Sequence, residues 1–300
     1  MVIFCIIAGI LILNSTCIIG MFLQLKEHAP ISLNGRDKIK LIFSGMIAFI
    51  ADAIGLGSFA VNIAMAKLFK TCSDEELPAM INGAQVIPGT IESLFFMQFV
   101  HVDLSTLFTL VAGTCLGGLF GGRLVSQLSQ QAVRVAMICC FILIMSLLLS
   151  KQLNLFPMAG SVVLLREWSL VFGFFGMMLC GALTSVGIGL FVMVQGVLFL
   201  LNVSPVVAFP IMMTAGAMQQ PLTTLVFLRQ RKIPLKKTLL LSLGGCIGIA
   251  IILPMFHLFS VGSLHMLLFC IVTYNLISVS RDYWRTRTRT RTQTSQLLSD

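Results

Sequence analysis

The seven residues Ala53–Phe59, AIGLGSF, place two glycines inside a long apolar run, where each weakens a helix by about 1 kcal/mol relative to alanine. The stretch SVGIGLF at 185–191 repeats this shape 132 residues later. The apolar segments around the two stretches, 39–70 and 167–201, hold 32 and 35 residues. At about 1.5 Å per residue, each is longer than one hydrocarbon core of about 30 Å. The glycines therefore predict a break in each long segment.

The composition predicts an all-α, polytopic membrane protein. Of the 300 residues, 57% are hydrophobic and 10% are charged, and the mean hydropathy is +1.00, whereas soluble domains carry about 25% charged residues. Long apolar runs favour helices, because the strands of a membrane barrel are shorter and alternate. The run at 2–25 lacks a basic start and an A-x-A-like site, so we expect a transmembrane span there and no signal peptide. Segments are expected near 2–25, 39–70, 77–98, 103–126, 131–150, 167–201, 205–228, 236–256 and 262–280.

The two long segments begin two similar halves of the chain. The matches are Ile54–Gly57 with Val186–Gly189, Pro88 with Pro221, and Gly113, Cys115 and Gly117 with Gly244, Cys246 and Gly248. They predict an internal duplication, with repeats at about 39–150 and 167–280. An additional N-terminal helix and basic loop would occupy 1–38, a linker 151–166, and a basic cytoplasmic tail 281–300.

The basic residues favour re-entrant hairpins over single crossings of the long segments, because cytoplasmic loops are rich in Lys and Arg. Single crossings divide the 20 Lys and Arg residues 16 to 4 between the two sides, and hairpins divide them 18 to 2. Hairpins give about seven full spans, two re-entrant segments, inverted repeats, an outside N-terminus and a cytoplasmic C-terminus. Single crossings stay an open alternative, because the margin is small and Asp74, Glu75 and Glu76 lie near two of the basic residues in question.

A hairpin tip inside the membrane would create a helix N-terminus near the midplane. The helices that start near Ser58 and Leu190 would offer N–H groups and positive dipole ends, which can bind an anion without a buried arginine. The alternative is that these glycines only pack helices together. For the glycines of LGGLFGG at 116–122, packing is the interpretation we adopt.

Two carboxylates lie deep in apolar runs, at Asp52 and Glu92. Buried carboxylates in membranes mark functional sites, so both are candidates for carrying a coupling proton; structural hydrogen bonds to neighbouring helices are the alternative. Thr184 stands in the place of Asp52 in the second copy, so a proton site would be asymmetric.

Uncharged polar residues and glycines gather in and after the turns, where they could hydrogen-bond a small solute. As ordinary contacts between helices they would contribute about 0.6 kcal/mol each. The candidate substrate-binding residues are Gly55, Gly57, Ser58, Asn62, Asn82, Gln85, Gly187, Gly189, Gln195, Gln219 and Gln220.

Other chemistries lack the residues that they need. The nine cysteines show no C-x-x-C spacing, so we expect neither disulfides nor a metal site. The absence of a nucleophile, base and oxyanion constellation predicts that the chain is not an enzyme and needs no cofactor. The net charge of +9 and the tail RDYWRTRTRTRTQT at 281–294 predict contact with anionic lipid headgroups and the bilayer, and no nucleic acid as partner.

Three stretches together resemble the TauE/SafE family of membrane transporters, the sulfite exporter group: AIGLGSF, LGGLFGGRLVSQLSQQAVRVAMICCFILI at 116–144, and SVGIGLFVMVQGVLFLLNVSPVVAF at 185–209. The resemblance covers about 39–280. It implies a bacterial inner-membrane carrier that exports small anions such as sulfite, organosulfonates or carboxylates. The family turns are richer in glycine, similar to G-x-G-G-G, whereas Ser58 and Phe59 fill the last two places here.

The sequence therefore leads to two functional hypotheses. The first is a secondary transporter that moves a small anion by alternating access, with a proton as the candidate coupling ion. A metabolite or amino-acid exporter of another family is the alternative within this class. The second is a non-transporting membrane assembly subunit whose glycines and carboxylates only pack helices. A homo-oligomer is compatible with either hypothesis.

Overall fold

The computed structural model of the chain describes residues 2–27, 33–54, 57–96, 102–153, 162–187, 189–258, 270 and 272–286. Its helices are α1 (Val2–Glu27), α2 (Gly35–Ala53), α3 (Ser58–Phe69), α4 (Leu77–Phe96), α5 (Leu104–Ser126), α6 (Gln130–Gln152), α7 (Glu167–Thr184), α8 (Leu190–Leu200), α9 (Pro205–Arg229), α10 (Leu235–Ile252) and the 3-10 turn η2 (Leu253–Leu258). Residues 272–286 are also helical. Within these ranges the expected all-α class is confirmed, and the β-structure consists of an isolated bridge between Val162 and Val203.

Five of the described helical stretches are long and apolar enough to cross a membrane: Ile6–Glu27, Leu104–Ser126, Gln130–Leu147, Glu167–Thr184 and Leu235–Met255. Large apolar side chains face outward, and Phe108 and Trp168 are 73% and 74% exposed. Such a surface suits lipid. The fold is therefore that of a helical membrane protein.

The long helices α4 and α9 are not among these five. They have 20 and 25 residues, but they carry polar side chains that the fold buries, including Gln85, Glu92 and Gln220. These polar side chains therefore lie in the interior of the bundle. Polarity, and not length, thus separates α4 and α9 from the five apolar stretches.

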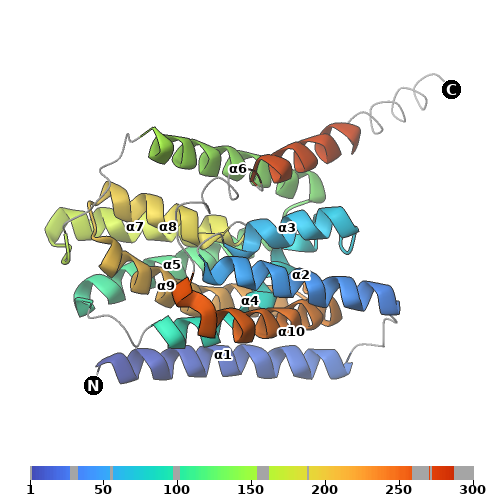
Figure 1. The fold of residues 1–300 in the computed structure, drawn as a ribbon, viewed down its shortest axis with the longest axis horizontal. Coiled ribbons are helices and arrows are strands. Elements are labelled where there is room, and N and C mark those ends of the chain that lie inside the picture. The colour runs from blue at the N-terminus through green and yellow to red at the C-terminus, as the bar shows by residue number, and fades with distance from the viewer. Residues whose placement is uncertain are drawn as a thin grey trace.

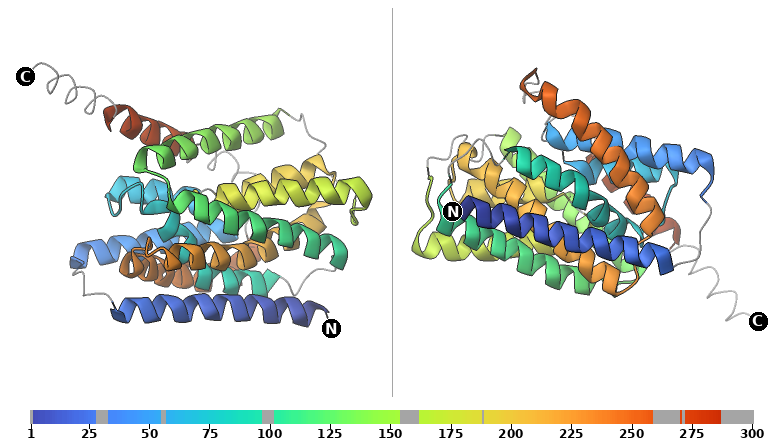
Figure 2. Two further views of the ribbon diagram at one scale, coloured as in Figure 1. Left: turned by 180° about the vertical axis from the view of Figure 1, so that it is seen from behind. Right: turned by 90° about the horizontal axis from the view of Figure 1, so that it is seen from below.

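The helices lie side by side with α1 on one flank and α6 on the other (Figure 1), and the view from behind shows the same order (Figure 2). Contacts between loops and helix termini identify the two ends of the bundle. At one end Arg231 lies 3.8 Å from Glu27, and Lys232 lies 3.6 Å from Glu75. We call this the basic end.

The opposite end is defined by the starts and ends of other helices. Val162 pairs with Val203, and the N–H of Leu165 donates to Thr106 Oγ1 over 3.2 Å. These contacts bring together the segment before α7, the turn after α8 and the start of α5. The start of α7 and the end of α8 therefore lie at the same end of the bundle.

Each long apolar segment folds back on itself at its glycine stretch. Figure 1 shows α3 returning beside α2 to the basic end, and α8 returning beside α7 to the opposite end. The first break lies between Ala53 and Ser58, and the second between Thr184 and Leu190. Each segment thus leaves by the end at which it entered, which is the hairpin path and not a single crossing. The two hairpins open toward opposite ends.

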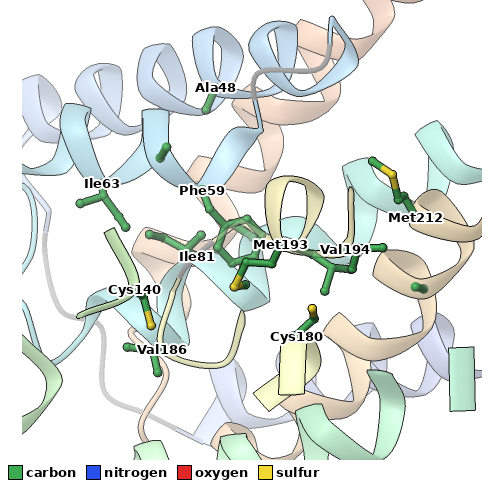
Figure 3. Close-up of a cluster of buried hydrophobic side chains, with 14 of the residues drawn as sticks. Ala48, Phe59, Ile63, Ile81, Cys140, Cys180, Val186, Met193, Val194 and Met212 are labelled. Carbon is green, nitrogen blue, oxygen red and sulfur yellow. The ribbon is translucent and has the colours of Figure 1, made fainter. Parts of the chain in front are cut away.

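The hairpin tips meet inside the core. A Cβ atom added to Gly189 would lie 3.7 Å from the Cβ of Phe59, so the start of α8 contacts the first turn of α3. Figure 3 shows the buried cluster at this place, where Phe59 from α3, Ile81 from α4 and Met193 from α8 belong to one core. Apolar packing between the tips holds the two breaks next to each other.

Glycines bring α5 against α7 and α10 against α2 at backbone contact. A Cβ at Gly117 would lie 1.9 Å from the carbonyl oxygen of Met178, and one at Gly244 would lie 1.9 Å from that of Ile42. Any side chain would separate the helices. The packing interpretation of the glycines at 116–122 is thereby confirmed for Gly117, which lies in that stretch.

The contacts of α5 with α7 recur between α10 and α2. The pairs are Gly113 with Phe174 and Gly117 with Met178 in the first case, and Gly244 with Ile42 and Gly248 with Met46 in the second. The glycines correspond at an offset of 131 residues and their contact residues at 132. Matched glycines in the two halves therefore make matched contacts, each reaching into the other half of the chain.

A buried ionic cluster ties α3, α6 and the 272–286 helix together at the basic end. Asp74 binds both Lys67 and Arg134, and these three side chains are 5%, 10% and 9% exposed. Lys67 also binds Asp282 over 2.7 Å, and Arg134 Nη1 donates to Thr286 Oγ1 over 2.7 Å. The carboxylate of Asp74 thus sits between two buried cations.

Candidate functional site

A small pocket lies where the two hairpin tips meet α4 and α9, and it holds about 30 Å³ of space open to water. One water molecule needs roughly 10–15 Å³ by this measure, so about two would fit. The lining comes from the two breaks and from α2, α3, α4, α8 and α9: Asp52, Gly57, Ser58, Phe59, Gln85, Gly89, Glu92, Gly189, Leu190, Phe191, Met212, Met213, Gly216, Ala217 and Gln220. None of these lining residues is Lys, Arg or His. Two carboxyl groups therefore share the pocket without a cation.

The first residues of α3 and α8 reach this pocket because glycines turn the chain just before them. Gly57 adopts a φ of 82° and Gly187 a φ of 99°, values that L-residues with a side chain rarely take. Ser58 and Leu190 begin the two helices. Two helix N-termini therefore border the pocket, as the glycine pattern predicts.

Replacing Gly57 by alanine should cost about 1–3 kcal/mol of stability, because a side chain would be forced into left-handed backbone. No atom of the described residues lies within 4 Å of the added Cβ, so the expected cost is conformational. Gly189 is the matched control: it holds the equivalent place in the other hairpin, and its added Cβ would make an ordinary contact at 3.7 Å. Equal losses for both variants, measured by equilibrium unfolding in mixed micelles, would contradict this account.

Asp52 closes the first hairpin from the last turn of α2. Its Oδ1 accepts the backbone N–H of Ser58 over 2.8 Å, and its Oδ2 accepts Gln85 Nε2 over 2.7 Å. Ser58 Oγ lies 2.9 Å from Asp52 Oδ2 and 2.8 Å from Gln85 Oε1. The N-terminus of α3 is therefore already capped by a carboxyl group of the protein itself.

The second hairpin has no such cap from the equivalent position. Thr184, in the place of Asp52, donates its hydroxyl to Cys180 O of its own helix over 2.8 Å. The expected asymmetry between the copies is thus visible in their hydrogen bonds. An anion could approach α8 without displacing Asp52.

Glu92 enters the pocket from α4 and is 2% exposed. Its Oε1 has no hydrogen-bond partner among the described residues. A buried carboxyl oxygen without a donor is costly. Such an atom fits a group that either carries a proton or binds something that enters the pocket.

The structure brings together seven of the candidate residues and separates five others from them. Those that line the pocket are Asp52, Gly57, Ser58, Gln85, Glu92, Gly189 and Gln220; those that do not are Asn62, Asn82, Gly187, Gln195 and Gln219. Gly55 lies outside the described residues.

The separated residues have other surroundings. Asn82 Nδ2 donates to Pro78 O over 2.9 Å and to Thr184 O over 3.3 Å, so it links α4 to the end of α7. Gln219 Nε2 donates to Thr223 Oγ1 over 2.6 Å on the same helix. Asn62 is buried and its amide atoms have no partner among the described residues, while Gln195 is half-buried on α8.

Part of the pocket wall comes from residues that sequence reasoning missed. Met212, Met213 and Gly216 line it from α9, and Gly89 lines it from α4. A usable signal exists, because Gly216 precedes Gln220 by four residues and residues four apart share a helix face. The same spacing joins Gly89 to Gln85.

Comparison with known proteins does not place the chain: no family model, no curated protein and no solved structure matches it. The function must therefore be argued from the pocket itself.

Proposed function

We propose that the chain is a secondary transporter that moves a small solute, together with a proton, by alternating access around the pocket between the hairpin tips. The observation that carries this is the pocket itself, to which two broken segments bring their helix N-termini from opposite ends. Broken helices around a central site are a recurring construction of such carriers. The resemblance to the TauE/SafE family, with its bacterial inner-membrane location, belongs to the same proposal.

Two features of the halves support inverted repeats and, with them, an alternating-access mechanism. The hairpins open toward opposite ends of the bundle, and matched glycines such as Gly117 and Gly248 make matched contacts with α7 and α2. An inverted duplication of 39–150 and 167–280 accounts for both features. In such an arrangement, exchanging the conformations of the two halves opens the pocket first to one side and then to the other.

The pocket as it stands is small. About 30 Å³ is too little for sulfite or a short carboxylate, which have several heavy atoms each. Admission of a solute thus requires the tips or α9 to move apart. Flexible Met212 and Met213 in the wall are suited to such a change, because methionine adapts to altered packing.

Charge determines how an anion could enter. Asp52 and Glu92 would repel an anion if both were ionised, and no lining residue supplies a positive side chain. A small anion such as sulfite, an organosulfonate or a carboxylate would therefore bind when the carboxyl groups hold protons. Anion and proton then move in the same direction.

A solute with an amino group is the second candidate, within the exporter alternatives. The unpartnered Glu92 Oε1 favours it, since an N–H donor in the pocket would satisfy this buried oxygen. The non-transporting alternative gives no reason for a pocket that contains two carboxyl groups at the meeting point of two breaks.

The proposal is tested with purified protein in lipid vesicles, using radiolabelled sulfite, a short organosulfonate, short carboxylates and a neutral amino acid. We expect a transmembrane proton gradient to drive accumulation of at least one of them. Asp52→Asn and Glu92→Gln should abolish or strongly reduce this gradient dependence. The matched control is Asp37→Asn, at an exposed carboxylate on α2, which should transport like the wild type. Folded wild-type protein that moves none of the solutes faster than empty vesicles would contradict the proposal for these solute classes.

A further inference from the structure

The side chains of Asp52, Ser58 and Gln85 form a closed triangle of polar atoms at the pocket. Asp52 Oδ2 lies 2.9 Å from Ser58 Oγ and 2.7 Å from the amide nitrogen of Gln85, and Ser58 Oγ lies 2.8 Å from the amide oxygen of Gln85. The three residues are 6%, 0% and 5% exposed. All three separations are hydrogen-bond distances.

Each hydrogen bond in the triangle needs its own hydrogen atom. The Ser58 hydroxyl has one hydrogen, and the Gln85 amide directs one toward Asp52. An ionised Asp52 supplies none. Two hydrogens would then serve three contacts, and one pair of oxygens would face each other at 2.8 or 2.9 Å in a buried site without a hydrogen between them.

A proton on Asp52 completes the triangle. Asp52 Oδ2 then donates to Ser58 Oγ, Ser58 Oγ donates to Gln85 Oε1, and Gln85 Nε2 donates to Asp52 Oδ2. The other carboxyl oxygen, Oδ1, still accepts the backbone N–H of Ser58. Every contact is satisfied once.

The count is the same for both orientations of the Gln85 amide, which exchange its nitrogen and oxygen. If the amide is turned over, its nitrogen donates to Ser58 Oγ and the hydroxyl donates to Asp52 Oδ2. The amide oxygen then lies against Asp52 Oδ2 at 2.7 Å, and only a carboxyl hydrogen can join the two. Both orientations thus require the same third hydrogen.

From this geometry we infer that Asp52 carries a proton on Oδ2 in this structure, and that the triangle with Ser58 and Gln85 is the proton-binding site of the proposed transporter. The role in transport rests on the proposed function, whereas the proton itself rests on the hydrogen count. Glu92 is the other titratable group that lines the pocket, and no Lys, Arg or His faces either carboxyl there.

Loss of the proton would change what the pocket offers to a solute. The charged carboxylate then accepts the hydrogen bond of the Ser58 hydroxyl, because hydrogen bonds to ionised groups are about twice as strong as neutral ones. Gln85 Oε1 then has no donor in the triangle and becomes an acceptor for a solute or water in the pocket. Since Ser58 is the first residue of α3, the same event changes the bonding at the start of that helix.

Infrared spectroscopy of the folded protein in detergent tests the inference without any transported solute. We expect the carbonyl band of a protonated carboxyl at neutral pH, shifted by D₂O and shifted again when aspartate is labelled with ¹³C. Asp52→Asn should remove the labelled component, whereas Glu92→Gln and Asp37→Asn should keep it. The labelled wild type gives an answer even if a variant fails to fold.

The outcomes separate this inference from the proposed function. A wild-type spectrum with no label-sensitive protonated aspartate, or a band that survives in folded Asp52→Asn, overturns the proton site. Transport in vesicles together with either of these results leaves the transporter standing and removes Asp52 as its proton carrier. A band with no transport of any tested solute supports the proton on Asp52 and contradicts a transporter for these solute classes.

Discussion

Replacing Asp74 by asparagine should lower the free energy of unfolding by about 3–5 kcal/mol, the usual cost of breaking a buried ion pair by removing one partner. Asp74 lies between Lys67 and Arg134, and all three side chains are at most 10% exposed. A neutral amide leaves two buried cations next to each other. Asp282 still binds Lys67 in this variant, but its side chain is 35% exposed and its contact with Lys67 exists already in the wild type, so it does not replace Asp74.

The matched control is Asp37→Asn, which also removes one carboxylate charge next to a lysine. Asp37 lies 3.8 Å from Lys40, and the two side chains are 46% and 41% exposed. An exposed pair of this kind contributes about 0–1 kcal/mol. Equilibrium unfolding in mixed micelles measures both variants, and similar losses for the two would refute the buried cluster as a stabilising element.

Breaking the cluster should also loosen the 272–286 helix. Arg134 binds Thr286, and Lys67 binds Asp282, so two of the cluster's cations hold that helix. Asp74→Asn removes the carboxylate that holds both Lys67 and Arg134 in place. Hydrogen exchange is therefore expected to rise in 272–286 in this variant, and to stay unchanged there in Asp37→Asn.

The hairpins were predictable because their signal is local. A segment that exceeds the membrane thickness must bend, and glycines such as Gly57 mark where. Both breaks in the structure contain their glycine stretch. Because Ser58 and Gly189 both follow the predicted turns, the sequence also predicted that they would share a site.

Other parts of the site depend on contacts between distant residues, which a single sequence does not contain. Gln85 is separated from Asp52 by 33 residues, and its amide is bound to that carboxyl and to Ser58. Its residue type suggested a direct contact with a solute. In the structure its amide is hydrogen-bonded to the carboxyl group of Asp52. This contact is part of the hydrogen-bond count from which the proton on Asp52 is inferred.

In the ionic cluster, too, the sequence suggests the contact between near residues and does not reveal the contact between distant ones. Lys67 and Asp74 are near each other in sequence and pair in the structure, which the acidic residues after α3 suggest. Arg134 lies 60 residues from Asp74 and joins the same carboxylate. Only the hairpin fold brings the start of α6 to the end of α3, so no local pattern could reveal the third member.

Substituting alanine for Gly117 or Gly244 should lower the free energy of unfolding by about 3 kcal/mol, the upper part of the usual range for overpacking. Each added Cβ would lie 1.9 Å from a backbone carbonyl oxygen of the facing helix, at Met178 and Ile42. Backbone cannot move aside as a side chain can. The helices themselves would have to separate.

Gly9→Ala in α1 is the matched control, because its added Cβ would make an ordinary contact with Met218 at 3.7 Å. Alanine is favoured over glycine inside a helix by about 1 kcal/mol, so this variant should be as stable as the wild type or more stable. Unfolding in mixed micelles measures all three. Gly117→Ala and Gly244→Ala should lose similar amounts, because each added Cβ would lie 1.9 Å from a backbone carbonyl oxygen of the facing helix. A loss in only one of them would contradict the view that close approach to a facing backbone carbonyl determines the cost.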